Sequence, residues 1–216
     1  MTEMHTLPMS SQWRAGRRKP RGNALVESAL VISLVFIPLA LGIAVIGLNI
    51  VRIIQVNQVN RDAGHMFARG VDFSGSTYGL LNQAVVFQMA QKLQDKTTNG
   101  TAVLILSAVE FLDSTTTCPS PCNNLHHVVI TKQITLGYSG LRSSSFNNKL
   151  QPTSLNADGT VKSPNTDTTA QADGVLTYLT MTDGDVAYVS ETFFSSADLP
   201  RSPILHPAGT YARAFF

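Results

Sequence analysis

Glu27 is a lone carboxylate at the start of a long uncharged run, Ser28–Val51, and Gly22 precedes it by five residues. A charged side chain near the centre of a membrane span costs about 2.5–3.5 kcal/mol, so such a residue usually has a function. The chemistry that a carboxylate offers in apolar surroundings is ion pairing with an amine. Glu27 lies four residues after Asn23, which places both on one helix face a turn apart.

Two other groups of residues contain potential metal ligands. Asp72, Ser74 and Ser76 match a D-x-S-x-S pattern, whose carboxylate and hydroxyl oxygens suit Mg²⁺. The residues before them indicate a helix, so we expect a capped turn between helices instead. His126 and His127 lie near the cysteines, but adjacent histidines on a strand point to opposite faces and lack the usual zinc spacing. We expect no metal and no cofactor.

No pairing of a nucleophile with a base stands out in the sequence, so we do not expect an enzyme. Asp183, Gly184 and Asp185 are typical of a turn before a strand.

Cys118 and Cys122 are the only cysteines, and they lie in the motif Cys-Pro-Ser-Pro-Cys. An extracytoplasmic compartment favours an oxidised pair. A disulfide across so short a loop contributes about 2 kcal/mol at most by loop entropy, so it would stiffen one loop.

The uncharged run Ser28–Val51 has 24 residues, which exceeds the roughly 20 residues needed to span a hydrocarbon core. It is too long for the apolar region of an ordinary cleaved signal peptide. Pro38 would kink the helix unless neighbouring helices or local adjustment accommodate it. Five basic residues precede the run, so we expect a cytoplasmic N-terminus and an extracytoplasmic remainder.

The basic residues are concentrated in the N-terminal segment. Residues 1–22 hold five of the 16 Lys and Arg residues and one of the 14 acidic residues, which leaves a formal net charge of −2 for the rest. The basic charge therefore indicates membrane topology, and we expect no nucleic-acid partner.

The remaining elements predict an α+β protein. The apolar spacing continues the first helix to Arg69, with Gly70 as its end, and Tyr78–Lys96 is typical of a second helix with a broad apolar face. Strands are expected at Ala102–Leu112, His127–Tyr138 and Asp185–Phe194, forming a small antiparallel sheet. Residues 139–174 are rich in Ser, Thr, Asn, Asp, Gly and Pro, and we expect a long surface loop there.

The N-terminal pattern resembles the processing and assembly signal of type IV prepilins. The segment Arg21–Leu30 is similar to the opening RG-x-A-x-V-E-F-A-L of TadE-like proteins, which are minor pilins or pseudopilins of type IVc, or tight-adherence, pilus systems. The segments Val59–Gly70 and Gly184–Glu191 resemble the helix continuation and the late strand of that family. Ser28 differs from the usual aromatic residue, and with the chain length it argues against a major pilin of the Flp type.

The resemblance implies a function and a set of partners. A prepilin peptidase would cut between Gly22 and Asn23, and Glu27 at the fifth mature position would guide assembly. The new amine of Asn23 is positive or nearly so at neutral pH, so Glu27 could pair with its own amine or that of a neighbouring subunit. The implied partners are the membrane, the peptidase, a pilus assembly ATPase with its membrane platform, and other pilin subunits. The implied location is the inner membrane, then the pilus or cell envelope.

The expected organisation is a leader at 1–22, a membrane and assembly helix at 23–70 and an extracytoplasmic domain at 71–216. Two other functions remain open. One is a single-pass, envelope-anchored adhesion or ligand-binding protein that is not assembled into a filament. The other is a metal-dependent adhesin built on Asp72, Ser74 and Ser76.

Overall fold

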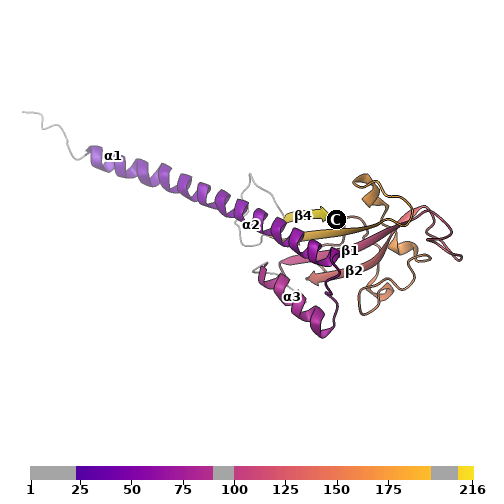
Figure 1. The fold of residues 1–216 in the computed structure, drawn as a ribbon. Helices are drawn as coiled ribbons and strands as arrows, with labels where there is room; N and C mark the ends of the chain where they lie inside the picture. Colours follow the sequence, from indigo (N-terminus) through magenta and orange to yellow (C-terminus); the bar gives the residue numbers. More distant parts are fainter. Residues whose placement is uncertain (1–22, 90–99, 196–208) are drawn as a thin grey trace, which may run out of the picture. The chain divides into compact units, whose positions relative to one another are not determined.

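The computed structural model describes residues 23–89, 100–195 and 209–216. Its N-terminal part is one helical segment made of α1 (Asn23–Val31), the π-helical turn η1 (Ile32–Phe36) and α2 (Ile37–Ala68) (Figure 1). The expected helix is therefore confirmed to within a residue of its predicted end. The chain divides into two compact units between Ile46 and Gly47, so the later part of α2 belongs to the unit that holds the sheet.

The π-helical turn ends at Phe36, two residues before Pro38. A proline has no backbone N–H, and its ring crowds the carbonyl four residues earlier, here that of Leu34. Widening the turn at Ile32–Phe36 is the kind of local adjustment that accommodates proline within a helix. Gly70 follows the end of α2 with a φ of +79°, a left-handed conformation that glycine adopts at little cost, and it ends the helix as expected.

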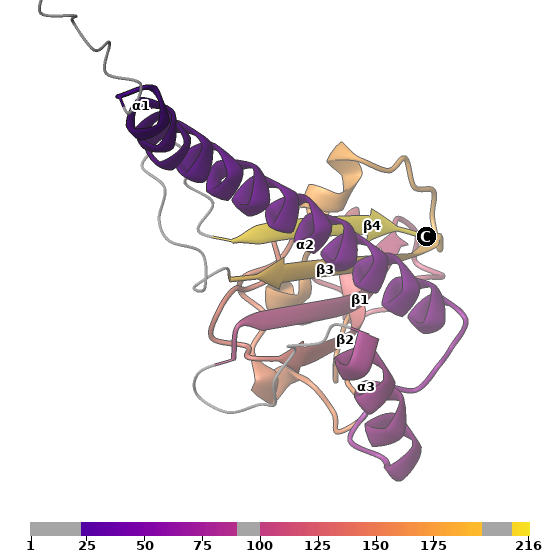
Figure 2. The same cartoon turned by 90° about the vertical axis from the view of Figure 1, so that its left-hand side faces the viewer.

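Four antiparallel strands form one sheet in the order β2-β1-β3-β4 (Figure 2). The strands are β1 (Ala102–Leu112), β2 (His127–Gly137), β3 (Val186–Phe194) and β4 (Thr210–Phe215). Three of them confirm predicted strands with shifts of at most one residue. The fourth strand, β4, was not predicted. It pairs with β3 along the sheet edge, with Glu191 opposite Arg213 and Phe193 opposite Tyr211.

Helices cover one face of the sheet. The sheet-facing residues of α2 and of α3 (Thr77–Met89) form a hydrophobic core with alternate residues of β1, including Leu104 and Leu106. The buried members of this core on the helical side are Val59, Ala63, Phe67, Phe73 and Val86. The second predicted helix is confirmed over Thr77–Met89; its expected continuation to Lys96 lies outside the described residues.

The opposite face of the sheet is covered by the long segment between β2 and β3. This segment contains three short 3₁₀ helices, η2 (Pro152–Ser154), η3 (Thr168–Ala170) and η4 (Asp173–Thr177). Its residues Val161, Ala170, Ala172 and Val175 are buried against the sheet residues Val109, Ile130 and Val189. The expectation of a surface loop at 139–174 thus needs correction, because the segment forms a packed third layer despite its polar composition.

Candidate functional site

Glu27 lies in the second turn of α1 and its side chain is exposed. Asn23 is the first helical residue, so the two positions lie on one helix face as the spacing predicted. Within the described residues no hydrogen bond or ion pair engages the Glu27 carboxylate. Ser28, the next residue, donates its hydroxyl to the carbonyl of Leu25 at 3.0 Å and so satisfies its own polar group. The carboxylate is therefore free to pair with an amine, while Gly22 lies outside the described residues.

The surface around Glu27 is apolar. One helix of the described chain, Ala24–Ala68, is long and apolar enough to cross a membrane, with a mean hydropathy of 2.8 in its most apolar window. Its large apolar side chains from Leu25 to Ile54 are exposed in the single chain, apart from the partly buried Val45. Such a surface is stable in lipid or against other apolar helices. In both environments the helix makes its backbone hydrogen bonds within itself. Membrane anchoring is compatible with this helix.

Polar contacts fix the later part of α2 on the sheet. Asn60 is buried, and its Oδ1 accepts hydrogen bonds from the hydroxyls of Ser190 and Thr192 at 2.8 Å each. One turn later, Gly64 lies so close to Phe216 that a Cβ atom there would be 2.2 Å from the ring. The sequence pattern identified the apolar members of this face but missed Asn60 and Gly64, because their partners lie 130 to 152 residues away.

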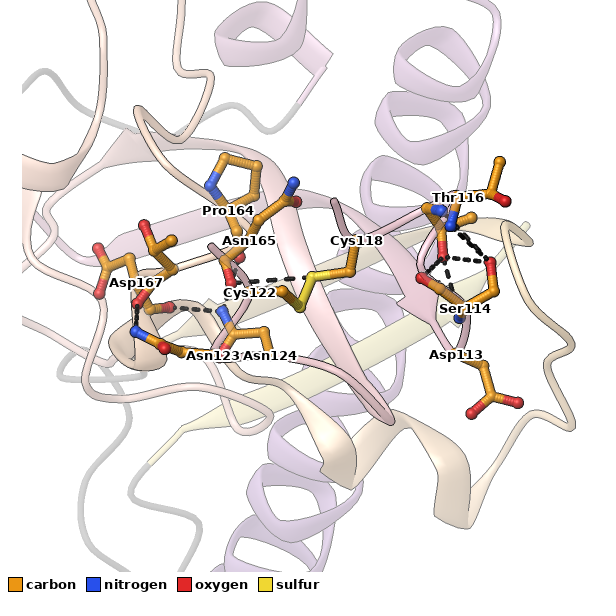
Figure 3. The surroundings of a disulfide bond; sticks show 12 residues. Asp113, Ser114, Thr116, Cys118, Cys122, Asn123, Asn124, Pro164, Asn165 and Asp167 are labelled. Atoms are coloured by element: carbon orange, nitrogen blue, oxygen red, sulfur yellow. Dashed lines mark hydrogen bonds between the residues drawn. A yellow bond between two sulfur atoms is a disulfide. The ribbon is translucent and has the colours of Figure 1, made fainter. Parts of the chain in front are cut away.

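The predicted disulfide is present, and it joins Cys118 to Cys122 in the connection between β1 and β2. Figure 3 shows this loop beside the segment that holds Pro164, Asn165 and Asp167. The backbone N–H groups of Asn123 and Asn124 donate to the carbonyl of Asn165 at 2.9 and 3.1 Å. The amide of buried Asn124 donates to the carbonyls of Pro164 and Asp167. The cysteine loop is therefore attached to the layer that covers the sheet.

Asp183 anchors the other end of the same loop. Its Oδ1 accepts hydrogen bonds from the backbone N–H groups of Asp113 and Ser114 and, at 2.6 Å, from the hydroxyl of Thr117. These donors, led by the contacts of Ser114 and Thr117, lower the pKa of Asp183 to about 2. Gly184 follows with a φ of +78°, and β3 begins two residues later. The predicted turn before a strand is confirmed, and it also holds the cysteine loop.

Replacement of both cysteines by serine is expected to lower the free energy of unfolding by no more than about 2 kcal/mol through loop entropy. Cys118 is also buried beside Leu112 and Val129, so the serine hydroxyl at this position adds a cost for burying a polar group. Denaturant unfolding of the detergent-solubilised chain measures the total change. Wild-type protein treated with a reductant isolates the cross-link, because its residues are unchanged. Equal stability of reduced and oxidised wild type would contradict the loop-entropy contribution.

Asp72, Ser74 and Ser76 converge in a capping turn between α2 and α3. The Asp72 carboxylate accepts from the Ser74 N–H at 2.8 Å and from the Ser76 hydroxyl at 2.5 Å. These hydrogen bonds lower the pKa of Asp72. The Ser76 hydroxyl oxygen in turn accepts from the N–H of Gly79 at 3.0 Å, which is the geometry of a helix N-cap. The expected capped turn is confirmed, and its oxygens are engaged within the chain.

The adjacent histidines point to different partners. Nδ1 of His126 contacts the carboxylate of Asp113, and Nδ1 of His127 lies 2.7 Å from that of Asp173. The two imidazoles do not converge with the disulfide sulfurs. No group of three or more His, Cys, Asp or Glu side chains that could hold a metal ion occurs among the described residues.

Glu191 is the centre of a buried polar cluster that sequence reasoning missed. The residue is 3% exposed, and its carboxylate accepts hydrogen bonds from the Ser144 hydroxyl, the Ser145 N–H and hydroxyl, and the Tyr211 hydroxyl. The Tyr211 contact is 2.5 Å, and burial followed by this hydrogen bond raises the pKa of Tyr211 to about 12. The cluster joins β3, β4 and the start of the covering layer. A glutamate as the lone charged residue of strand β3 was the available signal.

Two arginines lie on the aromatic residues around this cluster. The guanidinium of Arg142 lies 4.3 Å from the ring centroid of Tyr211, and that of Arg213 lies 4.0 Å from that of Tyr178. Within the described residues neither arginine forms an ion pair with Glu191. The arrangement therefore stabilises the edge strand through hydrogen bonds and cation–π contacts.

Comparison with known proteins adds no identification: no protein-family model, curated protein or solved structure matches this chain.

Proposed function

We propose that this chain is a structural minor pilin, or pseudopilin, subunit of a type IVc, tight-adherence filament or secretion apparatus. The observation that carries the proposal is Glu27, which is a lone, exposed carboxylate at the start of an apolar helix and lies one turn after Asn23. The Gly22-to-Glu27 spacing after a basic leader supports processing before Asn23. The disulfide-bearing α+β unit that packs on the later part of α2 supports an extracytoplasmic domain carried on an assembly helix.

The proposed route begins in the inner membrane, with the N-terminus in the cytoplasm and the sheet unit outside. A prepilin peptidase removes residues 1–22. An assembly ATPase and its membrane platform then move the mature subunit from the membrane into a pilus or the cell envelope. During this transfer the exposed apolar side chains of the helix exchange contacts with lipid for contacts with other pilin subunits. Exposure of these side chains to water is unfavourable, so one apolar environment replaces the other.

N-terminal sequencing of the protein from cell envelopes tests the proposal. We expect the mature chain to begin at Asn23. Gly22→Leu should accumulate a precursor heavier by 22 residues, because a bulky side chain replaces the small residue before the cut. Gly42→Leu is the matched control, since a Cβ atom at Gly42 meets no atom within 4 Å and this residue is remote from the cut. Native protein that begins upstream of Gly22 would overturn the proposal.

The alternative is a single-pass, envelope-anchored adhesion or ligand-binding protein. The same helix serves that function as an uncleaved anchor, and the same disulfide is expected outside the cytoplasm. An intact N-terminus together with absence from sheared filaments would favour it.

A further inference from the structure

The outer side of β4 is an open strand edge. The Phe216 N–H donates to the Tyr188 carbonyl at 2.9 Å, and the Phe216 carbonyl accepts from the Tyr188 N–H at 3.0 Å, so the polar groups of Phe216 point towards β3. Backbone groups alternate in direction along a strand, so those of Tyr211, Arg213 and Phe215 point away from β3. Within the described residues no hydrogen bond engages these outward groups.

The opposite edge of the sheet, at β2, is covered by the chain itself. The Val128 carbonyl accepts from the Ala172 N–H at 2.7 Å, and the Val128 N–H donates to the Asp173 carboxylate at 2.9 Å. Further along β2, the Thr131 carbonyl accepts from the Val161 N–H at 2.8 Å. The segment between β2 and β3 thus occupies this edge, whereas β4 ends the sheet on the other side (Figure 2). An open strand edge is a template for pairing with another extended chain.

Two guanidinium groups beside this edge lack an acidic partner. Arg213 stands opposite Glu191 in the register of β3 and β4, a position at which neighbouring side chains usually interact. The Glu191 carboxylate is engaged by hydroxyls and a backbone N–H, and the Arg213 guanidinium lies over the Tyr178 ring instead. The Arg142 guanidinium lies over the Tyr211 ring. Neither guanidinium forms an ion pair or a hydrogen bond within the part of the chain that the structure describes.

Stacking on aromatic rings orients both guanidinium groups and leaves their N–H edges free. A guanidinium held in this way binds a carboxylate through two parallel hydrogen bonds and loses little further side-chain freedom. Tyr211 and Arg213 project from the same face of β4, about 6.5 Å apart along the strand. Arg142 over Tyr211, together with Arg213 itself, therefore presents two positive charges at the spacing of alternate residues in a strand.

We propose that the β4 edge binds an extended acidic segment of another protein, which adds to the sheet as a fifth strand. The outward backbone groups of β4 pair with the backbone of this segment, and carboxylates on its alternate residues pair with Arg213 and Arg142. Arg213 is the only charged residue of β4, and antiparallel pairing of two β4 edges places it opposite its own copy, so like charges disfavour a second β4 as the occupant. The inference uses only the sheet unit and does not rest on the proposed function.

Peptide binding to the detergent-solubilised full chain tests the inference. The probe is a fluorescent, end-capped peptide, Thr-Glu-Val-Glu-Val-Glu-Thr, and its matched control carries Lys in place of each Glu. We expect saturable binding of the Glu peptide and binding of the Lys peptide that is at least about tenfold weaker, because its charges repel the two arginines. Equal affinity for the two peptides, or no binding of either, would overturn the inference.

Backbone methylation of the Glu peptide tests strand addition itself. One version is methylated at the nitrogens of the glutamates and the other at those of the valines. Only one of these two sets of N–H groups faces β4 in a paired strand, so one version should bind and the other should not. Equal binding of the two methylated versions would contradict pairing through the backbone.

Arginine variants test the carboxylate contacts. Arg213→Gln should weaken binding of the Glu peptide about tenfold, the loss expected for a hydrogen-bonded charged partner. Arg142 is exposed, so Arg142→Gln should cost about threefold and should not disturb folding. Lys149→Gln, which removes an exposed positive charge from the covering layer, is the matched control and should leave binding unchanged. Losses no larger than that of the control would overturn the assignment of the two arginines.

Amide hydrogen exchange, resolved by residue with NMR, locates the binding edge. The outward N–H groups of Tyr211, Arg213 and Phe215 should become protected only when the Glu peptide binds, whereas the N–H of Phe216 is protected without it. Protection elsewhere, with no change at β4, would overturn the inference. Tighter binding of a single-stranded oligonucleotide or of vesicles with anionic lipid would assign the arginines to phosphate groups and would overturn the acidic peptide as partner.

Discussion

Glu27→Gln is expected to prevent entry of the chain into filaments while cleavage after Gly22 and membrane insertion persist. If Glu27 pairs with the Asn23 amine of a neighbouring subunit, the substitution leaves that amine unpaired in apolar surroundings. Breaking a buried ion pair from one side costs roughly 3–5 kcal/mol. Insertion itself should not suffer, because a charge leaves an apolar segment. The processed protein in membranes and in sheared filaments is measured separately.

Glu27→Asp and Ser28→Ala are the matched variants for this test. Glu27→Asp keeps the charge on a shorter side chain and should retain part of the assembly. Ser28→Ala removes a hydroxyl that is already bonded to the Leu25 carbonyl within α1, so filaments should form normally. Wild-type amounts of Glu27→Gln in filaments would contradict a role of the carboxylate in assembly. Cleavage after Gly22 would not be affected by that result.

Glu191→Ala is expected to lower the free energy of unfolding by about 3–5 kcal/mol. The substitution leaves the hydroxyls of Ser144, Ser145 and Tyr211 and one backbone N–H without their buried acceptor. Each buried donor that loses its partner costs about 1–3 kcal/mol, and relaxation recovers part of the sum. Denaturant unfolding of the detergent-solubilised full chain measures the change.

Glu110→Ala is the control for this prediction. Glu110 lies on β1, and burial, followed by the charge of Asp183, raises the pKa of its carboxyl. No hydrogen bond to this carboxylate is found in the described part of the chain, so its removal should cost little. Similar losses for Glu110→Ala and Glu191→Ala would show that the effect comes from any glutamate of the sheet and would contradict a specific role for the cluster.

Local sequence patterns were sufficient for the elements that depend on neighbouring residues. The apolar run and its continuation predicted the helix to within a residue, because membrane-length hydropathy and helical spacing are local properties. Gly70 marked the helix end through a conformation that glycine adopts readily. Strands β1, β2 and β3 had β-rich composition with turns at their ends. The disulfide followed from two cysteines at short spacing, together with the expected extracytoplasmic location of this part of the chain.

Tertiary structure decided the features whose partners are far apart in the chain. Strand β4 is short, and its strand character depends on pairing with β3. The polar segment between β2 and β3 becomes a packed layer because its few apolar residues contact the face of the sheet that the helices leave uncovered. Sequence patterns carry no information on such long-range partners.

The same reason applies to the buried polar residues and to the orientation of α3. Glu191 gains its role from Ser144, Ser145 and Tyr211, which lie between 20 and 47 residues away. The apolar residues of α3 were evident from its sequence. Which side of the helix faces the sheet was not evident, because the hydrogen bonds of Gln83 to Phe73 and Ser74 set that orientation. The sequence by itself determined the helix, the charge at its start and the three main strands. Tertiary hydrogen bonds and packing decided which polar residues are buried and which apolar side chains stay exposed.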